Sequence, residues 1–213
     1  LFQRHAEEIG EWNVREVGAI PPMAQFAVSV ATQECYEASA LPSRPYGELI
    51  PSEQPRLSIA RRLPSGVVAV ISPFNVPIIL GIRSVAPALA LGNAVLLKPD
   101  PRTAVVGGVA IARIFEEAGL PPGVLQVLPG GADVGEALIT AEEVRVISFT
   151  GSTAVGRHIG ELAGRHLKRA HLELGGNSAL VVLADADVDQ AVTLAAFGSF
   201  FHQGQICMTT GRH

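Results

Sequence analysis

The chain has 213 residues, of which 48% are apolar and 17% are charged, and its net charge is −4. This composition supports a sizeable core and excludes a disordered chain. Without a long basic run, neither nucleic acid nor an anionic membrane is favoured as a partner. No apolar run reaches the roughly 20 residues that span a bilayer. Two widely separated cysteines make no disulfide framework, so a cytoplasmic location is expected.

The first 65 residues predict helices followed by a crossing segment. Apolar residues recur at helical spacing through residues 1–40, where Pro21-Pro22 separates two stripes. Cys35 follows the second stripe and is interpreted as a partly buried apolar side chain. Residues 41–65 hold five prolines and few apolar runs, which indicates a crossing loop or hairpin outside the core.

After Gly66, short β-branched runs alternate with helical stretches. This alternation predicts an α/β fold with a mostly parallel sheet. The runs are almost wholly apolar, as expected when helices cover both faces of the sheet. Strands are predicted at 67–72, 94–98, 124–128, 144–149, 170–174 and 179–183, and helices at 77–91, 103–118, 132–140, 153–166 and 187–200.

Polar or glycine-rich segments follow five of the predicted strands. They are "SPFN" (72–75), "KPDP" (98–101), "PGGADVG" (129–135), "TGSTAVG" (150–156) and the pair Gly175-Gly176. In an open α/β sheet, ligands bind beyond the carboxyl ends of the strands. These segments therefore predict one ligand that lies across several strand ends.

The segment "GSTAVG" opens a predicted helix but differs from the known phosphate motifs. It is not G-x-G-x-x-G, and Arg157-His158 stand where a P-loop needs Lys-Ser/Thr, which disfavours an ATPase. A glycine turn that leads into a helix presents free N–H groups and a dipole suited to a pyrophosphate. Ser152 could add a hydroxyl to such a site. A simple capped helix start remains the alternative.

Three further side chains at the strand ends have two readings each. Lys98 could reach ribose hydroxyls or a phosphate, or it could be a solvated surface lysine. Glu173 lies between two leucines, where a raised pKa would suit a general base; otherwise it is an exposed edge glutamate. Asn75 could cap the helix that follows it or donate to an oxyanion.

The cysteine near the end of the chain also has two readings. Cys207 lies three residues after Gly204, which lets the backbone approach closely. It is either a structural residue or a nucleophile, which would need a stabilised thiolate. The histidines show no convincing ligand spacing, and His171-x-Glu173 is too weak a pair to predict a metal site.

Taken together, the motifs resemble the aldehyde dehydrogenase superfamily. The matching stretches cover residues 60–212 almost without a gap, in the order of the family. The stretches are "ISPFNVP", "APALALGNAVLLKP", "PGVLQVLPG", "ISFTGSTAVGRHI", "LELGGNSALVVLADADVDQAV" and "GQIC". Within the family, the chain is most similar to benzaldehyde dehydrogenases, with vanillin and salicylaldehyde dehydrogenases close by, over "IRSVAPALALGNAVLLKPDPRTAV", "ELAGRHLKRAHLELGGNSALVVL" and "FHQGQICMTTGRH".

The resemblance implies oxidation of an aldehyde to the acid, with Cys207 as nucleophile, Glu173 as base and Asn75 as oxyanion donor. It also implies that NAD is the cofactor. NADP is possible, because Pro101 replaces the glutamate by which many members hold ribose hydroxyls, and Arg102 follows it. The implied cofactor contacts are Ile71, Ser72, Pro73, Phe74, Asn75, Lys98, Gly130, Gly151, Ser152, Thr153, Gly156, Glu173 and Leu174.

The resemblance also implies a division of the chain. Residues 1–62 would form N-terminal helices and a proline-rich crossing segment of the cofactor domain. Residues 63–203 would form the Rossmann-like NAD(P)-binding domain, and residues 204–213 would begin a catalytic domain. Family members are more than twice as long, so a fragment is expected that is inactive alone, from a parent homodimer or homotetramer acting on a small-molecule aldehyde. Phe74, Ile78, Phe201 and Ile206 are expected beside that aldehyde.

Two other classes of function remain open from the sequence. A non-catalytic nucleotide-binding module would keep the glycine turns but would not need Cys207 and Glu173 together. A cofactor-independent cysteine hydrolase would need a histidine beside the thiol, and His202 is the local candidate.

Overall fold

The computed structural model describes residues 1–213 and is built around one parallel sheet. Its strands are β3 (Val67–Ile71), β4 (Ala94–Lys98), β5 (Leu125–Val127), β6 (Val144–Thr150) and β7 (Arg169–Glu173). They lie in the order β5-β4-β3-β6-β7, and every neighbouring pair is parallel. Such a sheet is the core of a doubly wound dinucleotide-binding fold, with the direction of winding reversing between β3 and β6. The predicted α/β class is confirmed.

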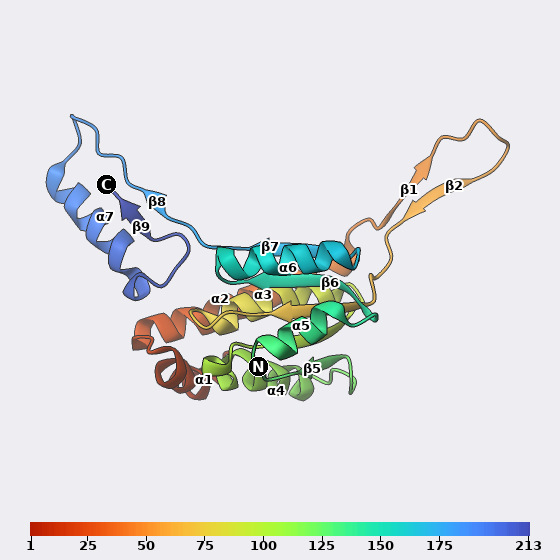
Figure 1. The fold of residues 1–213 in the computed structure, drawn as a ribbon, viewed down its shortest axis with the longest axis horizontal. Helices are drawn as coiled ribbons and strands as arrows, with labels where there is room; N and C mark the ends of the chain where they lie inside the picture. The colour runs from red at the N-terminus through yellow and green to blue at the C-terminus, as the bar shows by residue number, and fades with distance from the viewer.

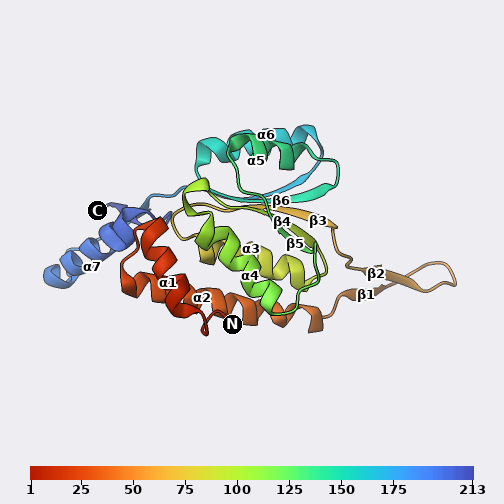
Figure 2. The same cartoon turned by 90° about the horizontal axis from the view of Figure 1, so that it is seen from below.

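Helices cover both faces of this sheet (Figure 2). One face carries α1 (Ala6–Trp12), α2 (Pro21–Ser39), α3 (Pro77–Ala90) and α4 (Ala110–Glu117), and the other carries α5 (Ala132–Thr140) and α6 (Thr153–Arg165). Because both faces are covered, the middle strand is almost wholly apolar and buried; Ala69 and Val70 are 0% and 1% exposed.

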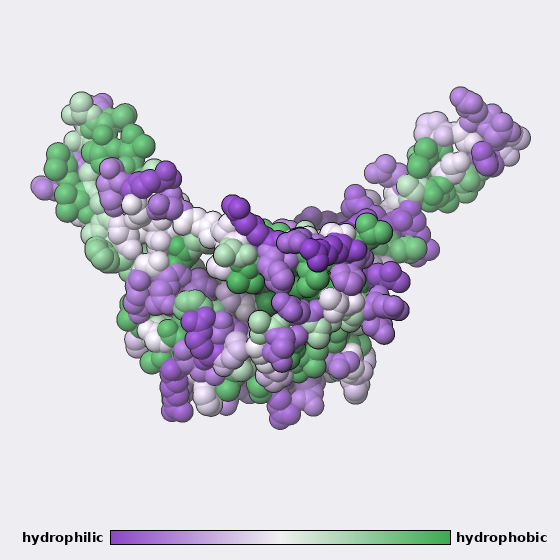
Figure 3. Space-filling view, in the orientation of Figure 1, coloured by the Kyte–Doolittle hydropathy of each residue, from purple (hydrophilic) through white to green (hydrophobic).

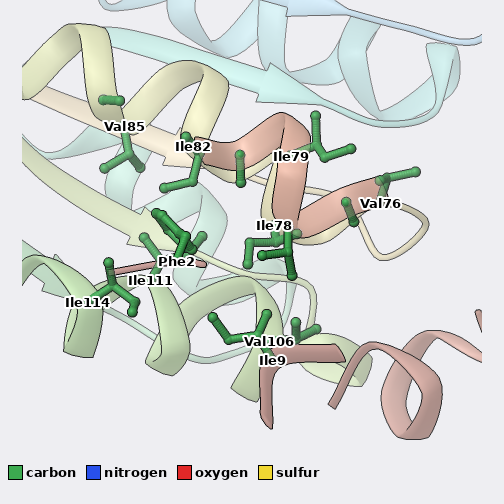
Figure 4. Packing of buried hydrophobic residues seen from close by; sticks show 14 of the residues in the cluster. Phe2, Ile9, Val76, Ile78, Ile79, Ile82, Val85, Val106, Ile111 and Ile114 are labelled. Atoms are coloured by element: carbon green, nitrogen blue, oxygen red, sulfur yellow. The ribbon is translucent and has the colours of Figure 1, made fainter. Parts of the chain in front are cut away.

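The core has one part on each face of the sheet. The larger part joins α1, α2, α3 and α4 to the sheet and includes Phe2, Ile9, Ile78, Ile82 and Ile111 (Figure 4). The smaller part lies under α5 and α6. Burying one such side chain contributes about 1.5–3 kcal/mol, so the sheet domain is held mainly by apolar packing.

The N-terminal helices are fixed to the sheet domain through a glutamate. A π-helical turn (Asn13–Val17) follows α1, and both carboxylate oxygens of Glu16 accept backbone N–H groups of Val105 and Val106, at 3.1 and 2.8 Å. These N–H groups open a second π-helical turn (Val105–Val109) that leads into α4. A carboxylate satisfies free N–H groups at such a helix start and complements its dipole.

Two segments project from this body on opposite sides (Figure 1). One is the antiparallel hairpin of β1 (Gly47–Ile50) and β2 (Ser58–Arg61), which agrees with the hairpin alternative for the proline-rich region. The other is the C-terminal lobe, which we define as residues 177–213. It contains β8 (Ser178–Ala179), α7 (Val188–Phe200), a 3-10 turn (Phe201–Gly204) and β9 (Thr210–Arg212). Two further 3-10 turns span Leu41–Ser43 and Pro101–Thr103.

Three details differ from the sequence prediction. The strand predicted at 179–183 is wrong: β8 has two residues and one partner, β9, so the apolar run beyond Ala179 has no sheet to join. The helix predicted from 103 begins as a 3-10 turn and a π-helical turn before α4. The helix predicted at 187–200 is present as α7, but it packs with the 3-10 turn and β9 rather than on the sheet. The assignment of domains otherwise stays a prediction.

No helix of the structure combines the length and the apolar character needed to cross a membrane.

Candidate active site

The candidate site lies at the carboxyl edge of the sheet, around the point where the winding reverses. The register places Ile71 of β3 beside Lys98 of β4 and Phe149 of β6, and Thr150 of β6 beside Glu173 of β7. The strand ends that the sequence singled out therefore meet along one edge. Ligands of open α/β sheets bind at such an edge.

Lys98 is buried, with 6% of the residue exposed, so its reading as a solvated surface lysine is wrong. Its Nζ donates to the carbonyl oxygen of Pro99 at 3.2 Å, and its side chain lies against Gly135 of α5. Burial lowers the pKa of this amine, while the carboxylates of Asp100 and Asp133 oppose that effect. An enclosed ammonium with unused N–H donors suits hydroxyl or phosphate oxygens.

The glycines at the strand ends allow close packing that a side chain would prevent. A Cβ on Gly151 would lie 2.5 Å from the ring of Phe149, one on Gly156 would collide with Leu174, and one on Gly130 would collide with Val134. The turn from Gly151 therefore brings the start of α6 close to the sheet edge. Glycine-rich turns of this kind let a pyrophosphate approach backbone N–H groups.

Ser152 caps helix α6, which Thr153 begins. Its Oγ accepts the N–H of Val155 at 3.3 Å, so the capped-helix reading is confirmed for Ser152 itself. Capping by Ser152 leaves other first-turn N–H groups of α6 free for an anion. The residues at this edge thus fit a dinucleotide.

Phe74 forms part of the wall after β3 and is covered by a cation. The guanidinium carbon of Arg102 lies 3.9 Å from the centre of the Phe74 ring. The same guanidinium donates to both carboxylate oxygens of Asp100, at 2.9 and 2.8 Å, which holds the pKa of that carboxyl below its usual range. Arg102, which the sequence suggested for a 2′-phosphate, is therefore already paired.

Asn75 connects the sheet domain to the C-terminal lobe. Its side-chain Nδ2 donates to the backbone carbonyl oxygen of Gln205 at 2.6 Å. The backbone carbonyl oxygen of Asn75 accepts a hydrogen bond from Nε2 of His202 at 2.7 Å. No cap from the Asn75 side chain to α3 is present, so the helix-cap alternative is wrong. The amide retains a second hydrogen that can be donated to a ligand.

Cys207 lies two residues after Gln205 and is exposed. Its backbone packs against Gly176, where a Cβ would collide with the carbonyl oxygen of Cys207. The N–H of Ser178 also donates to the carbonyl oxygen of Thr209 at 3.2 Å. The segment after β7 therefore runs directly beside the cysteine, and the structure brings the two distant parts of the site together.

Glu173 ends β7, three residues before Gly176. Its side chain is 62% exposed, and Oε1 lies 3.3 Å from Nε2 of His171. The sequence expectation of a carboxylate enclosed by leucines is therefore wrong: the flanking leucines point to the other face of the strand, since neighbouring side chains alternate. The carboxylate is instead accessible to water.

Other features of the surface do not add to this site. No group of three or more His, Cys, Asp or Glu side chains is placed to hold a metal ion. A hollow of about 490 Å³ lies between α1 and α4, away from the strand ends. Ile78, expected beside the aldehyde, is fully buried in the core, whereas Phe74, Phe201 and Ile206 are half-buried.

Sequence reasoning missed the role that two residues, Gly176 and His202, have in building the site. Gly176 was read as part of a glycine-rich strand end, and its contact with Cys207 depends on a chain path that local patterns do not encode. His202 was considered as a base for the thiol, but its Nε2 binds the carbonyl of Asn75 instead. The only signals in the sequence were that Gly176 follows the motif of Glu173 and that His202 precedes the motif of Cys207.

Comparisons with known proteins agree with this geometry. The whole chain, residues 1–213, matches the sequence profile of the aldehyde dehydrogenase family. A vanillin dehydrogenase from an Amycolatopsis species is 73% identical over 213 residues, which are 100% of this chain and 44% of the relative. A benzaldehyde dehydrogenase [NAD(+)] from Pseudomonas putida is 56% identical over 97% of this chain and 42% of its own length.

Solved structures give the same result. A salicylaldehyde dehydrogenase from Pseudomonas putida G7, complexed with salicylaldehyde, superposes with a TM-score of 0.93 and 41% identity, over 98% of this chain and 44% of that one. An NAD-dependent benzaldehyde dehydrogenase from Corynebacterium glutamicum has a TM-score of 0.91 and 48% identity, over 98% and 46%.

The chain belongs to the aldehyde dehydrogenase family, as the sequence motifs indicated. It spans less than half the length of the curated relatives it matches.

Proposed function

We propose that the protein containing this chain oxidises an aromatic aldehyde to the carboxylic acid with NAD. The chain would supply the nucleotide site together with Asn75, Glu173 and Cys207. One observation carries the proposal: the 2.6 Å hydrogen bond from Asn75 to Gln205 joins the strand edge to the segment that bears Cys207. A nucleophile and an amide donor beside a nucleotide cradle are the parts that aldehyde oxidation needs.

The strand ends would hold the cofactor in an extended arrangement. Lys98 would bind ribose hydroxyls, the turn Gly151–Gly156 would face the pyrophosphate, and Ile71–Phe74 would line the nicotinamide end, with Gly130 and Leu174 at the margins. When bound, NAD supplies the hydride acceptor. NAD is favoured over NADP because Asp100 already neutralises Arg102, the cation that the sequence suggested for a 2′-phosphate. The name of the Pseudomonas putida relative, which specifies NAD(+), supports the same choice.

The first chemical step would be the attack of the Cys207 thiolate on the aldehyde carbon. A C–S bond forms and the carbonyl π electrons move to oxygen, which gives a thiohemiacetal oxyanion on Cys207. The second amide hydrogen of Asn75 and the backbone N–H of Cys207 would donate to this oxygen. One such donor typically contributes about 10²–10³ in rate. Loss of hydride from the former aldehyde carbon then leaves a thioester on Cys207.

Glu173 would release the acid from this thioester. Its carboxylate takes a proton from water as the water oxygen attacks the thioester carbon; the C–S bond breaks and Cys207 leaves as the thiolate. The exposure of Glu173 supports this role, because the base must meet solvent water. Water would thus be the acyl acceptor.

The aromatic substrate class rests on the relatives, which are named for vanillin, benzaldehyde and salicylaldehyde. Other properties of the full-length protein are proposed from fewer observations. The exposed apolar residues of the β1–β2 hairpin, such as Leu49 and Ile59 at 72% and 58%, favour a homodimer or homotetramer. Two unpaired cysteines favour the cytoplasm. Residues 1–213 alone are proposed to be inactive.

The test is reduced-nicotinamide formation by the full-length protein with benzaldehyde and NAD, with NADP and hexanal as comparisons. Cys207→Ala should lower turnover at least about 10³-fold while the affinity for NAD is kept. Reduction with hexanal alone would overturn the aromatic class. NAD binding without any reduction would favour a nucleotide-binding module. Ester hydrolysis without nicotinamide would favour the cysteine hydrolase, although the hydrogen bond from His202 to Asn75 argues against it.

A further inference from the structure

The turn that precedes Cys207 has a strained backbone. His202, Gln203 and Gly204 have φ values of 49°, 55° and 72°, so three successive residues are left-handed. Only glycine adopts this conformation without a steric cost; histidine is found there more often than most residues, and glutamine is not. A turn of this kind persists where its surroundings hold it in place.

Side chains of the turn bind the body of the protein. Nε2 of His202 lies 2.7 Å from the carbonyl oxygen of Asn75, and Nε2 of Gln203 donates to the carbonyl oxygen of Gly18 at 3.0 Å. A carbonyl oxygen only accepts, so the His202 ring carries its hydrogen on Nε2. Nδ1 of His202 is buried without a partner, and the residue is 8% exposed. The ring therefore makes one hydrogen bond, and Asn75 receives it.

The same asparagine is also bound through its side chain. Nδ2 of Asn75 donates to the carbonyl oxygen of Gln205, the residue after Gly204. Asn75 is thus joined to the turn at two points, by its backbone oxygen and by its amide nitrogen. Two attachments fix both the position of the backbone and the rotation of the amide, so the direction of the remaining amide hydrogen is fixed as well.

We propose that His202 is a positioning residue that orients the Asn75 amide toward the oxygen of a substrate held on Cys207. This inference rests on the proposed function. His202 acts through Asn75 and not on the thiol, because Nε2 is committed to a carbonyl and Nδ1 is enclosed. Its hydrogen bond acts together with the one from Asn75 to Gln205 to hold the loop after β3 against the segment that precedes the nucleophile.

Three substitutions in the full-length protein separate this hydrogen bond from the backbone conformation. His202→Leu removes the donor. His202→Asn suits the left-handed backbone but carries its nitrogen one bond closer to the main chain, out of reach of Asn75. His202→Gln places an amide nitrogen the same number of bonds from Cβ as Nε2 of histidine, so the donor is restored. His166→Leu, at the far end of α6, is the matched control because that histidine is exposed and distant from the strand ends.

The kinetic result expected is a selective loss of turnover. His202→Leu and His202→Asn should lower kcat about 10–100-fold, the usual effect of a misplaced catalytic group, with KM for benzaldehyde and Kd for NAD within about threefold. His202→Gln should stay within about threefold of the wild-type kcat, and His166→Leu should equal it. A general structural role would instead lower Tm, raise Kd and fail to be rescued by glutamine.

Crystal structures of the same variants supply a readout that needs no activity. In His202→Leu the distance from Nδ2 of Asn75 to the carbonyl oxygen of Gln205 should exceed 3.5 Å, the limit of a hydrogen bond, and in His202→Gln it should return to about 2.6 Å. Suppose that the wild type is fully active and that Asn75→Ala lowers its turnover. If His202→Leu then keeps wild-type turnover, the positioning role is overturned and the proposed function stands. A wild type that reduces no nicotinamide overturns the proposed function. The positioning role is tested separately by the crystal structure of His202→Leu, and an Asn75 amide that has not moved there overturns it. If His202→Leu does not fold, the Asn and Gln variants decide between these outcomes.

Discussion

The sheet domain and the C-terminal lobe are ordered in different ways. In α3 of the sheet domain, seven residues are buried, and Ile78, Ile82 and Val85 are 0% exposed. In α7 of the lobe no residue is buried, and Phe197 and Phe200 are 62% and 77% exposed. Figure 3 shows the lobe as an arm rich in apolar residues beside a more evenly mixed body. Apolar packing therefore holds the first region but contributes little to the second.

Because of this difference, the two parts of the candidate site are held in place in different ways. The residues proposed to hold the nucleotide stand on strands and helix starts that the core fixes, so they are rigid without help from the lobe. Cys207 stands on the lobe and depends on a few hydrogen bonds to Asn75 and Gly18 and on the contact with Gly176. Nucleotide binding and catalysis should therefore respond separately to mutation.

The largest expected effect tests whether the two regions form one site. Glu173 belongs to the sheet but should act on the thioester of Cys207. Glu173→Gln in the full-length protein should slow steady-state turnover about 10²–10⁴-fold, because glutamine cannot take a proton from water. A rapid first turnover, seen as a burst of reduced nicotinamide in stopped-flow absorbance, should remain. Loss of the burst would show that Glu173 is needed before hydrolysis.

A pair of equivalent truncations tests the difference in packing. In the 213-residue chain, Ile82→Ala should lower the free energy of unfolding by about 2–5 kcal/mol, because it leaves a cavity in the core. Leu194→Ala in α7, where the residue is 54% exposed, should change it by less than about 0.5 kcal/mol. Urea unfolding followed by circular dichroism measures both. Equal losses would mean that the lobe contributes its own core.

The smallest effect concerns the contact between the regions. Gly176→Ala places a methyl group against the carbonyl of Cys207, so the lobe must shift and turnover of the full-length protein should fall about 10-fold or more. NAD affinity, measured by calorimetry, should not change. Gly164→Ala on α6 is the control, since a Cβ there meets nothing within 4 Å. It should keep full activity and add about 0.5–1 kcal/mol of stability. Wild-type activity in Gly176→Ala would show that the lobe accommodates the methyl group.

Local pattern was sufficient to predict the sheet domain. Four of the five strands, β3 to β6, are short and mostly apolar runs closed by glycine, proline or a polar residue, whereas β7 is largely polar; all five appear in the structure. The residues after these strands could be predicted to converge, because parallel strands end at a common edge. Lys98 and Glu173 show the limit of such patterns: one proved buried and the other exposed, since burial depends on neighbours from other elements.

The lobe could not be predicted in the same way. The run "ALVVL" has the composition of a buried strand, yet only Ala179 joins β8, because β9 supplies a single short partner. The hydrogen bonds that hold the segment before Cys207 join residues more than 100 positions apart, and no periodicity encodes them. The roles of Cys207, Glu173 and Asn75 came from family resemblance, and those roles remain predictions.

The left-handed turn at 202–204 also has a consequence for the order of folding. The residues that hold it, Gly18 and Asn75, precede it by 185 and 127 positions. Contacts of such high sequence separation form late, after loop closure has been offset by other packing. During synthesis from the N-terminus, all five strands of the sheet precede residues 202–204 and can fold before them. We therefore expect the thiol of Cys207 to reach its final position only on a body that has already folded, after the proposed nucleotide site has formed.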